Sequence, residues 1–425
     1  MPNLAQLGRP DVFRSRCGRG VRRPVMRILF VSPRQCWPPL TGARLREYHL
    51  LRSLAGQAQL THVFFSQPPL LSPSADFPLC PITLSVPQPS LYTPAKVVRG
   101  LLGKWPLPVV NYMAPEMETT IKTILTEVPF DLIHLDSIHM AAYAPMIARA
   151  TRAPIVYDWH NIESEVMRRY SAIVNSPLRK LYAAVTASRL STLERRLLRD
   201  GFGHLVCSER EREQLHQIVP GARIAVIENG VDTIFFSSFE DVPQKRFRLV
   251  YVGSMNYLAN IEAVTLFVRN VWPLVRTEFP NWRLTVVGSN PTPTVLALSN
   301  ETNVEVTGTV PDVRPFYREA VAAIVPLYTG GGTRLKILEA MAAGVPVVST
   351  SLGAEGLGVS PGHNILIADK DEEWLPHLSA LSSQNALWRR LAANGRDLVS
   401  CRYDWALLGH LLVNTYRQWL GAIAP

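Results

Sequence analysis

The sequence predicts an α/β protein with two doubly wound, Rossmann-like domains that face a central cleft. Its 425 residues are too many for one ordinary domain and indicate two or three. Short apolar runs alternate with amphipathic segments, which is typical of parallel βα units. The turn-rich segment Glu228–Asp232 divides these units near the middle of the chain. Ligands bind at the carboxyl ends of the strands in such sheets, so the cleft is the expected site.

In the first half, five apolar runs indicate buried strands. They are Ile28–Ser32, Leu60–Phe65, Asp131–Leu135, Ile155–Asp158 and His204–Ser208. The proline-rich passage 68–94 is interpreted as an irregular surface excursion with one further candidate strand, Ile82–Val86. Pro177 and Gly201 stand where a first-turn proline and a C-terminal cap belong, so a helix is predicted over Pro177–Asp200.

The second half repeats this alternation and ends in helices. The expected strands are Arg248–Gly253, Arg283–Gly288, Val304–Thr307, Ala322–Pro326, Val345–Ser349 and Asn364–Ala368. The expected helices are about Asn260–Val275, Thr333–Ala343, Asp371–Ser382, Asn385–Ser400 and Trp405–Leu420.

Composition indicates a globular protein, since 47% of the residues are hydrophobic and 18% are charged. The five cysteines are scattered without a CxxC pair, which favours reduced thiols in a cytoplasmic protein. No apolar stretch approaches the roughly 18 residues that span a bilayer.

The net charge of +10 is uneven along the chain. Residues 1–25 hold six arginines and one acid, and they are interpreted as a disordered basic extension or as a mis-assigned start before Met26. Docking on an anionic membrane surface and a solvated basic face explain the basic helix 177–200 equally well. Nucleic-acid binding is not expected, because no basic stripe has interleaved aromatic residues.

The segment Tyr328–Pro346 carries the clearest chemical signal. A predicted strand runs into consecutive glycines, and a helix is predicted from Thr333. Glycines let a phosphate approach backbone amides, and a helix start offers unpaired N–H groups. The three glycines are Gly330, Gly331 and Gly332.

Charged side chains at the same helix start support this interpretation. Arg334 and Lys336 oppose the helix dipole, which a bound anion would explain. Glu339 lies one turn beyond Lys336, where its carboxylate could accept hydrogen bonds from ribose hydroxyls. A solvated lysine–glutamate pair beside a tight turn is the competing explanation. No GxxxxGK[ST] or GxGxxG motif is present.

The run from Gly330 to Thr350, continued by Gly353–Leu357, resembles the donor-binding core of the group 1 (family 4) glycosyltransferases. Further similar blocks are Glu228–Asp232, Tyr251–Asn260, Gly308–Asp312 and Tyr403–Trp405. The resemblance covers most of the chain from Met26 and implies the GT-B fold and retention of anomeric configuration. Within the family, the chain is most similar to sugar transferases of exopolysaccharide and exosortase (PEP-CTERM) systems.

The resemblance also assigns domains. We expect an acceptor-side domain at 26–228, a nucleotide-sugar donor domain at 229–404, and a C-terminal helix at about 405–425 that crosses back to the first domain. The donor would be a UDP- or GDP-linked sugar, bound as a substrate, with no further cofactor. The acceptor would be a saccharide or a lipid-linked saccharide.

Two departures from the family pattern concern the donor site. The family's E-x7-E motif places its ribose-binding glutamate at Glu339, but its first, sugar-directed glutamate falls at Gly331. The usual basic pair after the first strand of the donor domain is also missing, where this chain has Gly253 in the run Val252–Tyr257. We expect Arg334 and Lys336 to take over the phosphate charge.

In the first domain, His160 follows a predicted strand and resembles the family histidine that contacts the donor. A packed histidine that Asp158 orients is the alternative. Gly42, before a predicted helix, and Asp136, at a strand end, are candidates for the acceptor side. A helix cap explains Asp136 equally well.

A metal site at His134, Asp136 and His139 is not expected, because His134 points opposite to its neighbours on a strand. Asp369-Lys-Asp371 matches a DxD motif but lies where a solvated loop and helix start are expected. We predict no catalytic metal. Two other functions stay open: a nucleotide-sugar 2-epimerase of similar fold, and a non-catalytic nucleotide-binding assembly protein.

Overall fold

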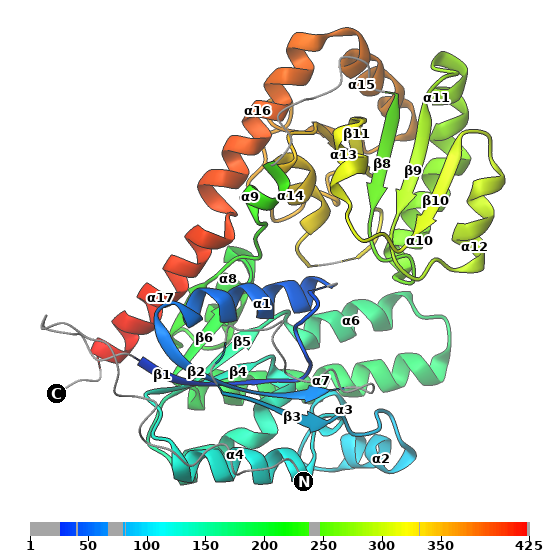
Figure 1. The fold of residues 1–425 in the computed structure, drawn as a ribbon. Coiled ribbons are helices and arrows are strands. Elements are labelled where there is room, and N and C mark those ends of the chain that lie inside the picture. The colour runs from blue at the N-terminus through cyan, green and yellow to red at the C-terminus, as the bar shows by residue number, and fades with distance from the viewer. Residues whose placement is uncertain are drawn as a thin grey trace, which may run out of the picture.

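The computed structural model describes residues 26–422 apart from 40, 67–79, 81, 238–246 and 331. The basic extension predicted at 1–25 lies outside the described residues. Two parallel sheets lie one above the other, each with helices on both faces, and two long helices run down one side (Figure 1). The predicted pair of doubly wound α/β units is confirmed.

The lower sheet has seven strands in the order β3-β2-β1-β4-β5-β6-β7. Residues Ile28 to Val31 in its centre are almost fully buried, as expected for a strand covered on both faces. Its strands are β1 (Met26–Ser32), β2 (Ala58–Ser66), β3 (Ile82–Pro87), β4 (Leu132–Asp136), β5 (Ile155–Trp159), β6 (Gly203–Val206) and β7 (Ile224–Val226).

Helices connect these strands and cover both faces of the sheet. They are α1 (Gly42–Ala55), α2 (Pro94–Leu102), α3 (Leu107–Val110), α4 (Pro115–Glu127), the 3₁₀ segment η3 (Ile138–Tyr143), α5 (Ala144–Ala150), α6 (Glu163–Ile173), α7 (Pro177–Asp200) and α8 (Glu209–Ile218). The bounds of α7 are those predicted, with proline in its first turn and Gly201 as its cap.

The upper sheet has six strands in the order β10-β9-β8-β11-β12-β13. The strands are β8 (Arg248–Val252), β9 (Arg283–Val287), β10 (Val304–Gly308), β11 (Ala320–Val325), β12 (Val347–Ser349) and β13 (Leu366–Ile367). The helices are α9 (Thr233–Ser237), α10 (Leu258–Leu266), the π segment η4 (Phe267–Val271), α11 (Trp272–Glu278), α12 (Pro293–Leu296), η5 (Ala297–Asn300), α13 (Arg314–Arg318), α14 (Leu335–Ala342), α15 (Asp371–Ser383), α16 (Asn385–Arg402) and α17 (Trp405–Gly421).

All the strands expected in both halves are present, and the candidate at 82–86 is the edge strand β3. Strand β7 was not predicted. It has only three residues, all half-buried, so it lacks the apolar run that marks the central strands.

The order of strands reverses between β1 and β4 in the lower sheet and between β8 and β11 in the upper sheet. Loops leave such a reversal in opposite directions and open a space at the carboxyl ends of the strands. The residues after these four strands are therefore the best placed to bind ligands.

The C-terminal helix α17 packs on the lower domain, as predicted. Trp405, Leu412 and Trp419 join a core formed with β1 and α1. Tyr416 Oη lies 2.5 Å from Nδ1 of the buried His134 on β4. The last element of the chain is thus built into the first domain.

The chain crosses between the domains twice, and the two crossings are bonded to each other. Val231 N donates to Tyr403 O at 2.8 Å, and Trp405 N donates to Val231 O at 3.2 Å. Arg402 and Glu228 form an ion pair beside them at 3.0 Å. The two domains are therefore joined by two chain segments that are hydrogen-bonded to each other.

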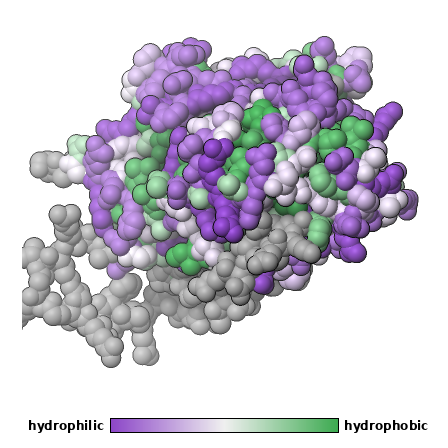
Figure 2. All heavy atoms as spheres, turned by 90° about the horizontal axis from the view of Figure 1, so that it is seen from above, coloured by the Kyte–Doolittle hydropathy of each residue, from purple (hydrophilic) through white to green (hydrophobic). Residues whose placement is uncertain are grey.

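Seen from above, the surface is largely hydrophilic, with apolar side chains in separate patches (Figure 2). Among the described residues, no helix is both long and apolar enough to cross a membrane.

Candidate functional site

The glycine-rich loop follows β11 at the strand reversal of the upper sheet. Gly330 and Gly332 have φ values of 107° and 80°, which favour glycine because a Cβ is strained there. Gly331 lies outside the described residues. Helix α14 begins at Leu335 rather than at the predicted Thr333, and Arg334 occupies its N-cap position without a side-chain cap bond. The amides of this helix start therefore lack a side-chain acceptor from the N-cap residue.

Arg334 is a buried cation at this helix start, with only 6% of its surface exposed. Its guanidinium donates to the carbonyl oxygens of Gly332 and, at 3.4 Å, Leu352. Its Nε has no partner among the described residues. Burial lowers the pKa of Arg334. An arginine held in this way is suited to bind an anion that brings its own charge to the site.

Lys336 is held by neutral groups beside Arg334. Its Nζ donates to Tyr251 Oη and Asn260 Oδ1, both at 2.8 Å, and lies 4.2 Å from the centre of the Tyr251 ring. Burial lowers the pKa of Lys336 to about 7, although Glu339 opposes the shift. The ammonium is therefore poised to gain a full charge when an anion binds.

Because Gly253 has no side chain, the ammonium of Lys336 fits against its backbone. A Cβ at Gly253 would lie 2.9 Å from Lys336 Nζ and 2.9 Å from Asn260 Nδ2. The glycine follows β8, which is next to β11, so the two predicted donor-side loops meet at the strand reversal.

Glu339 lies on α14 beyond Lys336, as predicted. Burial raises the pKa of Glu339 to about 7, while Lys336 and a hydrogen bond from Tyr317 lower it in part. Both side chains are half-buried rather than fully solvated.

In the lower domain, His160 follows β5 and pairs with a carboxylate. Its Nε2 lies 2.9 Å from Asp136 Oδ1 and 3.7 Å from Asp158 Oδ2. The predicted orienting partner was Asp158, but Asp136 is nearer. Burial opposes ionisation of Asp136, yet His160 and Arg34 more than offset it, so its pKa is lowered. Asp136 is therefore ionised and can accept a hydrogen bond from Nε2 of His160.

Asp158 instead binds Arg46 of α1, which was not a predicted site residue. Arg46 Nε and Nη2 donate to its two carboxylate oxygens at 2.8 and 2.6 Å, and both side chains are at most 1% exposed. Burial lowers the pKa of Arg46, but Asp158 more than offsets this and raises it. The two residues form a fixed, two-point ion pair.

Glu47, the next residue on α1, is also fully buried. Arg34 Nε lies 3.6 Å from its Oε2. Burial, and then the charge of Asp136, raise the pKa of Glu47 well above its usual value. Glu47 is therefore the protonated member of this pair of neighbouring carboxyl groups.

A chain of hydrogen bonds joins this cluster to the glycine-rich loop. Arg46 Nη1 donates to Ile227 O at 2.7 Å and to Asn229 Oδ1 at 3.2 Å. Asn229 Nδ2 donates to Thr333 Oγ1 at 3.0 Å. Asn229 belongs to the first crossing between the domains, so it touches both halves of the site.

The two domains also approach each other closely at two glycines. A Cβ at Gly42, at the start of α1, would lie 3.3 Å from Leu335 Cδ1. A Cβ at Gly332 would lie 3.7 Å from Asn161 Oδ1, one residue after His160. The predicted residues of the two domains thus meet at one junction.

The geometric reason given against a metal site was wrong. His134 and Asp136 are two residues apart on β4 and share a face, and their ligand atoms and that of Asp158 lie within 4.8 Å of one another. These groups face Tyr416, His160 and Arg46 respectively. The absence of a catalytic metal stays a prediction. In the DxD-like run, Asp369 accepts from Ser351 and Asp371 opens α15, as expected.

Family models match both halves of the chain. The glycosyl transferase 4-like domain matches residues 8–230, and the group 1 glycosyl transferases match residues 246–383. The chain is a group 1, family 4-like glycosyltransferase. The expected family is therefore shown.

Solved structures with similar folds cover nearly the whole glycosyltransferase. Sucrose-phosphate synthase from Thermosynechococcus elongatus has 18% identity and a TM-score of 0.70, covering 93% of this chain and 100% of that one. HepE from Anabaena, in complex with UDP and glucose, has 16% identity and a TM-score of 0.64, covering 92% and 100%. At these identities the similarity shows the fold, which is the expected GT-B fold.

A curated relative is similar over part of the glycosyltransferase. It is described as an uncharacterized 44.6 kDa protein in the cps region of Klebsiella pneumoniae, 26% identical over 164 residues. These residues are 37% of this chain and 42% of the length of that relative.

Proposed function

We propose that this glycosyltransferase moves a sugar from a UDP- or GDP-linked donor to a saccharide or lipid-linked saccharide acceptor. The observation that carries the proposal is the buried guanidinium of Arg334, which donates to two backbone carbonyls, has an Nε without a hydrogen-bond partner among the described residues, and lies beside Lys336 at a helix start. A diphosphate supplies the negative charge that this arrangement lacks.

On the donor side, the diphosphate would lie against the amides of the loop from Gly330 and the start of α14. Cleavage of the anomeric C–O bond leaves negative charge on the departing phosphate oxygen. Arg334, Lys336 and the loop amides would stabilise that charge without a metal and without a further cofactor. Glu339 would accept hydrogen bonds from the ribose. Residues 229–404 form the donor domain in this proposal.

On the acceptor side, His160 would contact the sugar or the departing phosphate, with Asp136 holding its proton. Residues 26–228 and about 405–425 would form the acceptor domain, and Gly42 allows a close approach near the start of α1. The acceptor hydroxyl would attack the face that the leaving group vacates and give up its proton to the departing phosphate oxygen, with retention of configuration. Retention rests on the family resemblance.

The comparisons support the biological setting that we propose. HepE was solved in complex with UDP and glucose, and the curated relative is a protein of a cps region. We propose a role in exopolysaccharide or cell-surface glycan synthesis, at the cytoplasmic face of a membrane. The link to exosortase systems stays a prediction.

A panel of UDP- and GDP-sugars tests the central claim, with thermal shift reporting binding and nucleotide release reporting turnover. We expect one base to stabilise the protein, and Glu339→Ala to weaken that binding while Glu372→Ala, an exposed acid on α15, does not. If no nucleotide stabilises the protein, the proposal fails.

The same panel separates the alternatives. Conversion of the donor sugar without transfer would favour the 2-epimerase, and binding without turnover under any acceptor would favour the assembly protein.

A further inference from the structure

Helices α6 and α7 form a hairpin whose free end exposes apolar side chains. The turn between them spans 174–176, and the helices pack on each other along their length (Figure 1). Leu178 is 81% exposed and Leu181 is 64% exposed, and Val166, Tyr170 and Val185 are exposed near them. Both leucines lie near the start of α7 and point into solvent.

The same end of the hairpin is strongly cationic. Residues 166–193 contain five basic residues and no acid. The basic residues are Arg168, Arg169, Arg179, Lys180 and Arg189. Arg169 is paired with Glu165 at 2.6 Å, whereas Arg179 and Lys180 are exposed beside Leu178. Exposed leucines flanked by cations are typical of helices that lie in the interface of an anionic bilayer.

Helix α2 extends this surface. It exposes Val98 and Leu102, with Tyr92 just before it. Residues 92–104 carry Lys96, Arg99 and Lys104 and no acid. Arg189 of α7 donates to the carbonyl of Gly103 at the end of α2, and Arg196 lies 4.6 Å from the ring of Trp105. The two segments are therefore joined, and both lie on one side of the lower domain (Figure 1).

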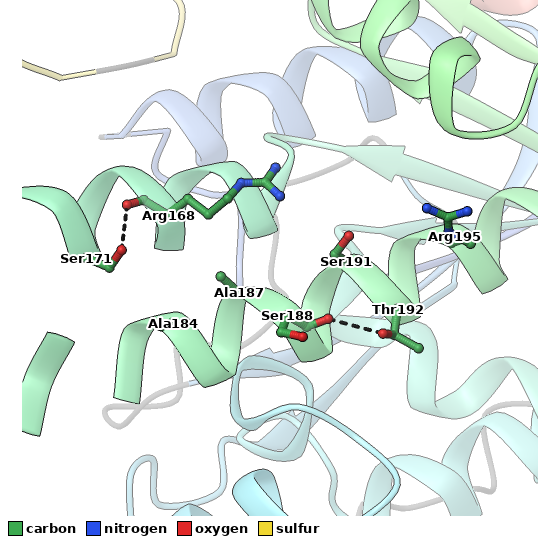
Figure 3. A pocket seen from close by; sticks show the side chains of 8 residues that line it. All are labelled: Arg168, Ser171, Ala184, Ala187, Ser188, Ser191, Thr192 and Arg195. Atoms are coloured by element: carbon green, nitrogen blue, oxygen red, sulfur yellow. Dashed lines mark hydrogen bonds between the residues drawn. The ribbon is translucent and has the colours of Figure 1, made fainter. Parts of the chain in front are cut away.

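A groove between α6 and α7 adds a polar hollow to the same hairpin. Its volume is about 490 Å³. Figure 3 shows Arg168 reaching from α6, and Arg195 on α7, with hydroxyl groups between them. The hydroxyl groups of α7 are those of Ser188, Ser191 and Thr192. Arginines and hydroxyls in one groove suit a lipid phosphate.

We propose that α2 and the α6–α7 hairpin dock this glycosyltransferase on an anionic lipid bilayer. The exposed leucines enter the interface, the cations bind headgroups, and the groove between α6 and α7 takes one lipid phosphate. This inference rests on the proposed function, because it supplies the acceptor at the bilayer surface.

The hairpin also sets how the site faces the bilayer. Helix α6 starts at Glu163, three residues after His160, and its 11 residues span about 16 Å. The site therefore lies about one helix length from the docked end. A saccharide on a lipid anchor reaches His160 from the bilayer, while the donor enters from the other domain.

Sedimentation with vesicles tests the docking. With vesicles of phosphatidylcholine and phosphatidylglycerol at roughly a two-to-one ratio, we expect binding at low salt that weakens at moderate salt. The pair Arg179→Gln, Lys180→Gln removes two exposed cations and should weaken binding by about 30-fold, or about 2 kcal/mol at ~1 kcal/mol per cation. The pair Leu178→Ser, Leu181→Ser should weaken it by at least about tenfold.

Matched controls use exposed residues on the other long helices. The pairs Arg389→Gln, Arg390→Gln on α16 and Leu407→Ser, Leu411→Ser on α17 should leave vesicle binding unchanged. In a Cys17→Ser, Cys401→Ser background, a polarity-sensitive fluorophore at Leu181→Cys should shift to the blue with anionic vesicles, and one at Leu411→Cys should not.

The docking and the proposed function can fail separately. The hairpin variants should keep donor binding and nucleotide release in solution, because they lie outside the donor site. Three results would each overturn the docking. The wild-type protein could bind pure phosphatidylcholine vesicles as well as anionic ones, or it could bind neither. The hairpin variants could also bind anionic vesicles as well as the wild-type protein does. If the wild-type protein binds anionic vesicles but binds no nucleotide-sugar donor, the proposed function is overturned and the docking stands.

Discussion

Replacement of Lys336 by methionine should stabilise the free protein and abolish tight donor binding. The ammonium is enclosed by Tyr251 and Asn260, which are neutral, while part of the side chain remains exposed. A fall in pKa from 10.5 to about 7 corresponds to about 5 kcal/mol at ~1.4 kcal/mol per unit. Screening by solvent at the exposed part reduces this to about 2 kcal/mol. Methionine keeps most of the apolar stem and leaves Tyr251 Oη bonded to Asn260 Oδ1.

The pH dependence gives the sign of this effect. A lysine whose pKa is lowered on folding destabilises the folded state fully below about pH 7, and the penalty disappears as the pH rises towards 10.5. The advantage of Lys336→Met should therefore be about 2 kcal/mol at pH 7 and fade to zero in alkaline solution. Saturating nucleotide should reverse the order, since a ligand at 100 times its Kd stabilises the wild-type protein by about 2.7 kcal/mol.

Urea unfolding followed by tryptophan fluorescence, at several pH values with and without UDP or GDP, measures these differences. Lys122→Met, an exposed lysine on α4, is the control and should change stability by at most about 0.5 kcal/mol. The reasoning is refuted if Lys336→Met destabilises the free protein by ~2 kcal/mol, or if it binds nucleotide as well as the wild type.

Three further predictions follow from the described contacts. Gly253→Ala should weaken donor binding by about tenfold in a nucleotide titration, because its Cβ would displace the ammonium beside it, whereas Gly56→Ala, with nothing within 4 Å, should not. Asn229→Ala breaks the bonds to both domains and should raise KM for the donor while the melting temperature of the whole protein stays nearly unchanged. An unchanged KM would argue against a link across the junction. Tyr416→Phe removes the bond to a buried histidine and should cost about 1 kcal/mol in the free energy of unfolding, which urea titration would detect.

Sequence patterns were sufficient for the central strands and for most helices. Buried strands such as β1 and β11 are continuous apolar runs, and α7 has proline and glycine at its two ends, so local composition determines them. β7 escaped prediction because an edge strand of three half-buried residues gains its structure from pairing with β6, which is a tertiary effect.

The candidate site was predictable on the donor side and much less so on the acceptor side. Arg334 and Lys336 lie within one short segment, so their proximity is a matter of local sequence. Arg46 meets Asp158 only because the fold brings α1 next to the end of β5, and the two residues are 112 positions apart in the chain. Nothing in the sequence near Arg46 indicates that partner, although a charged residue within the apolar stripe of a helix is a signal that could have drawn attention to it.

The double connection between the domains has a mechanical consequence. A single linker would let the donor domain twist and slide, but the crossings at Val231 and Asp404 are bonded to each other and so behave as one pivot. Rotation about an axis through that pair is the softest motion that preserves both bonds. The contact between Asn229 and Thr333 lies next to this pivot, so it moves little in such a rotation, while residues farther from the axis move more. The axis along which the two domains open and close is thus set by two residues far apart in the chain.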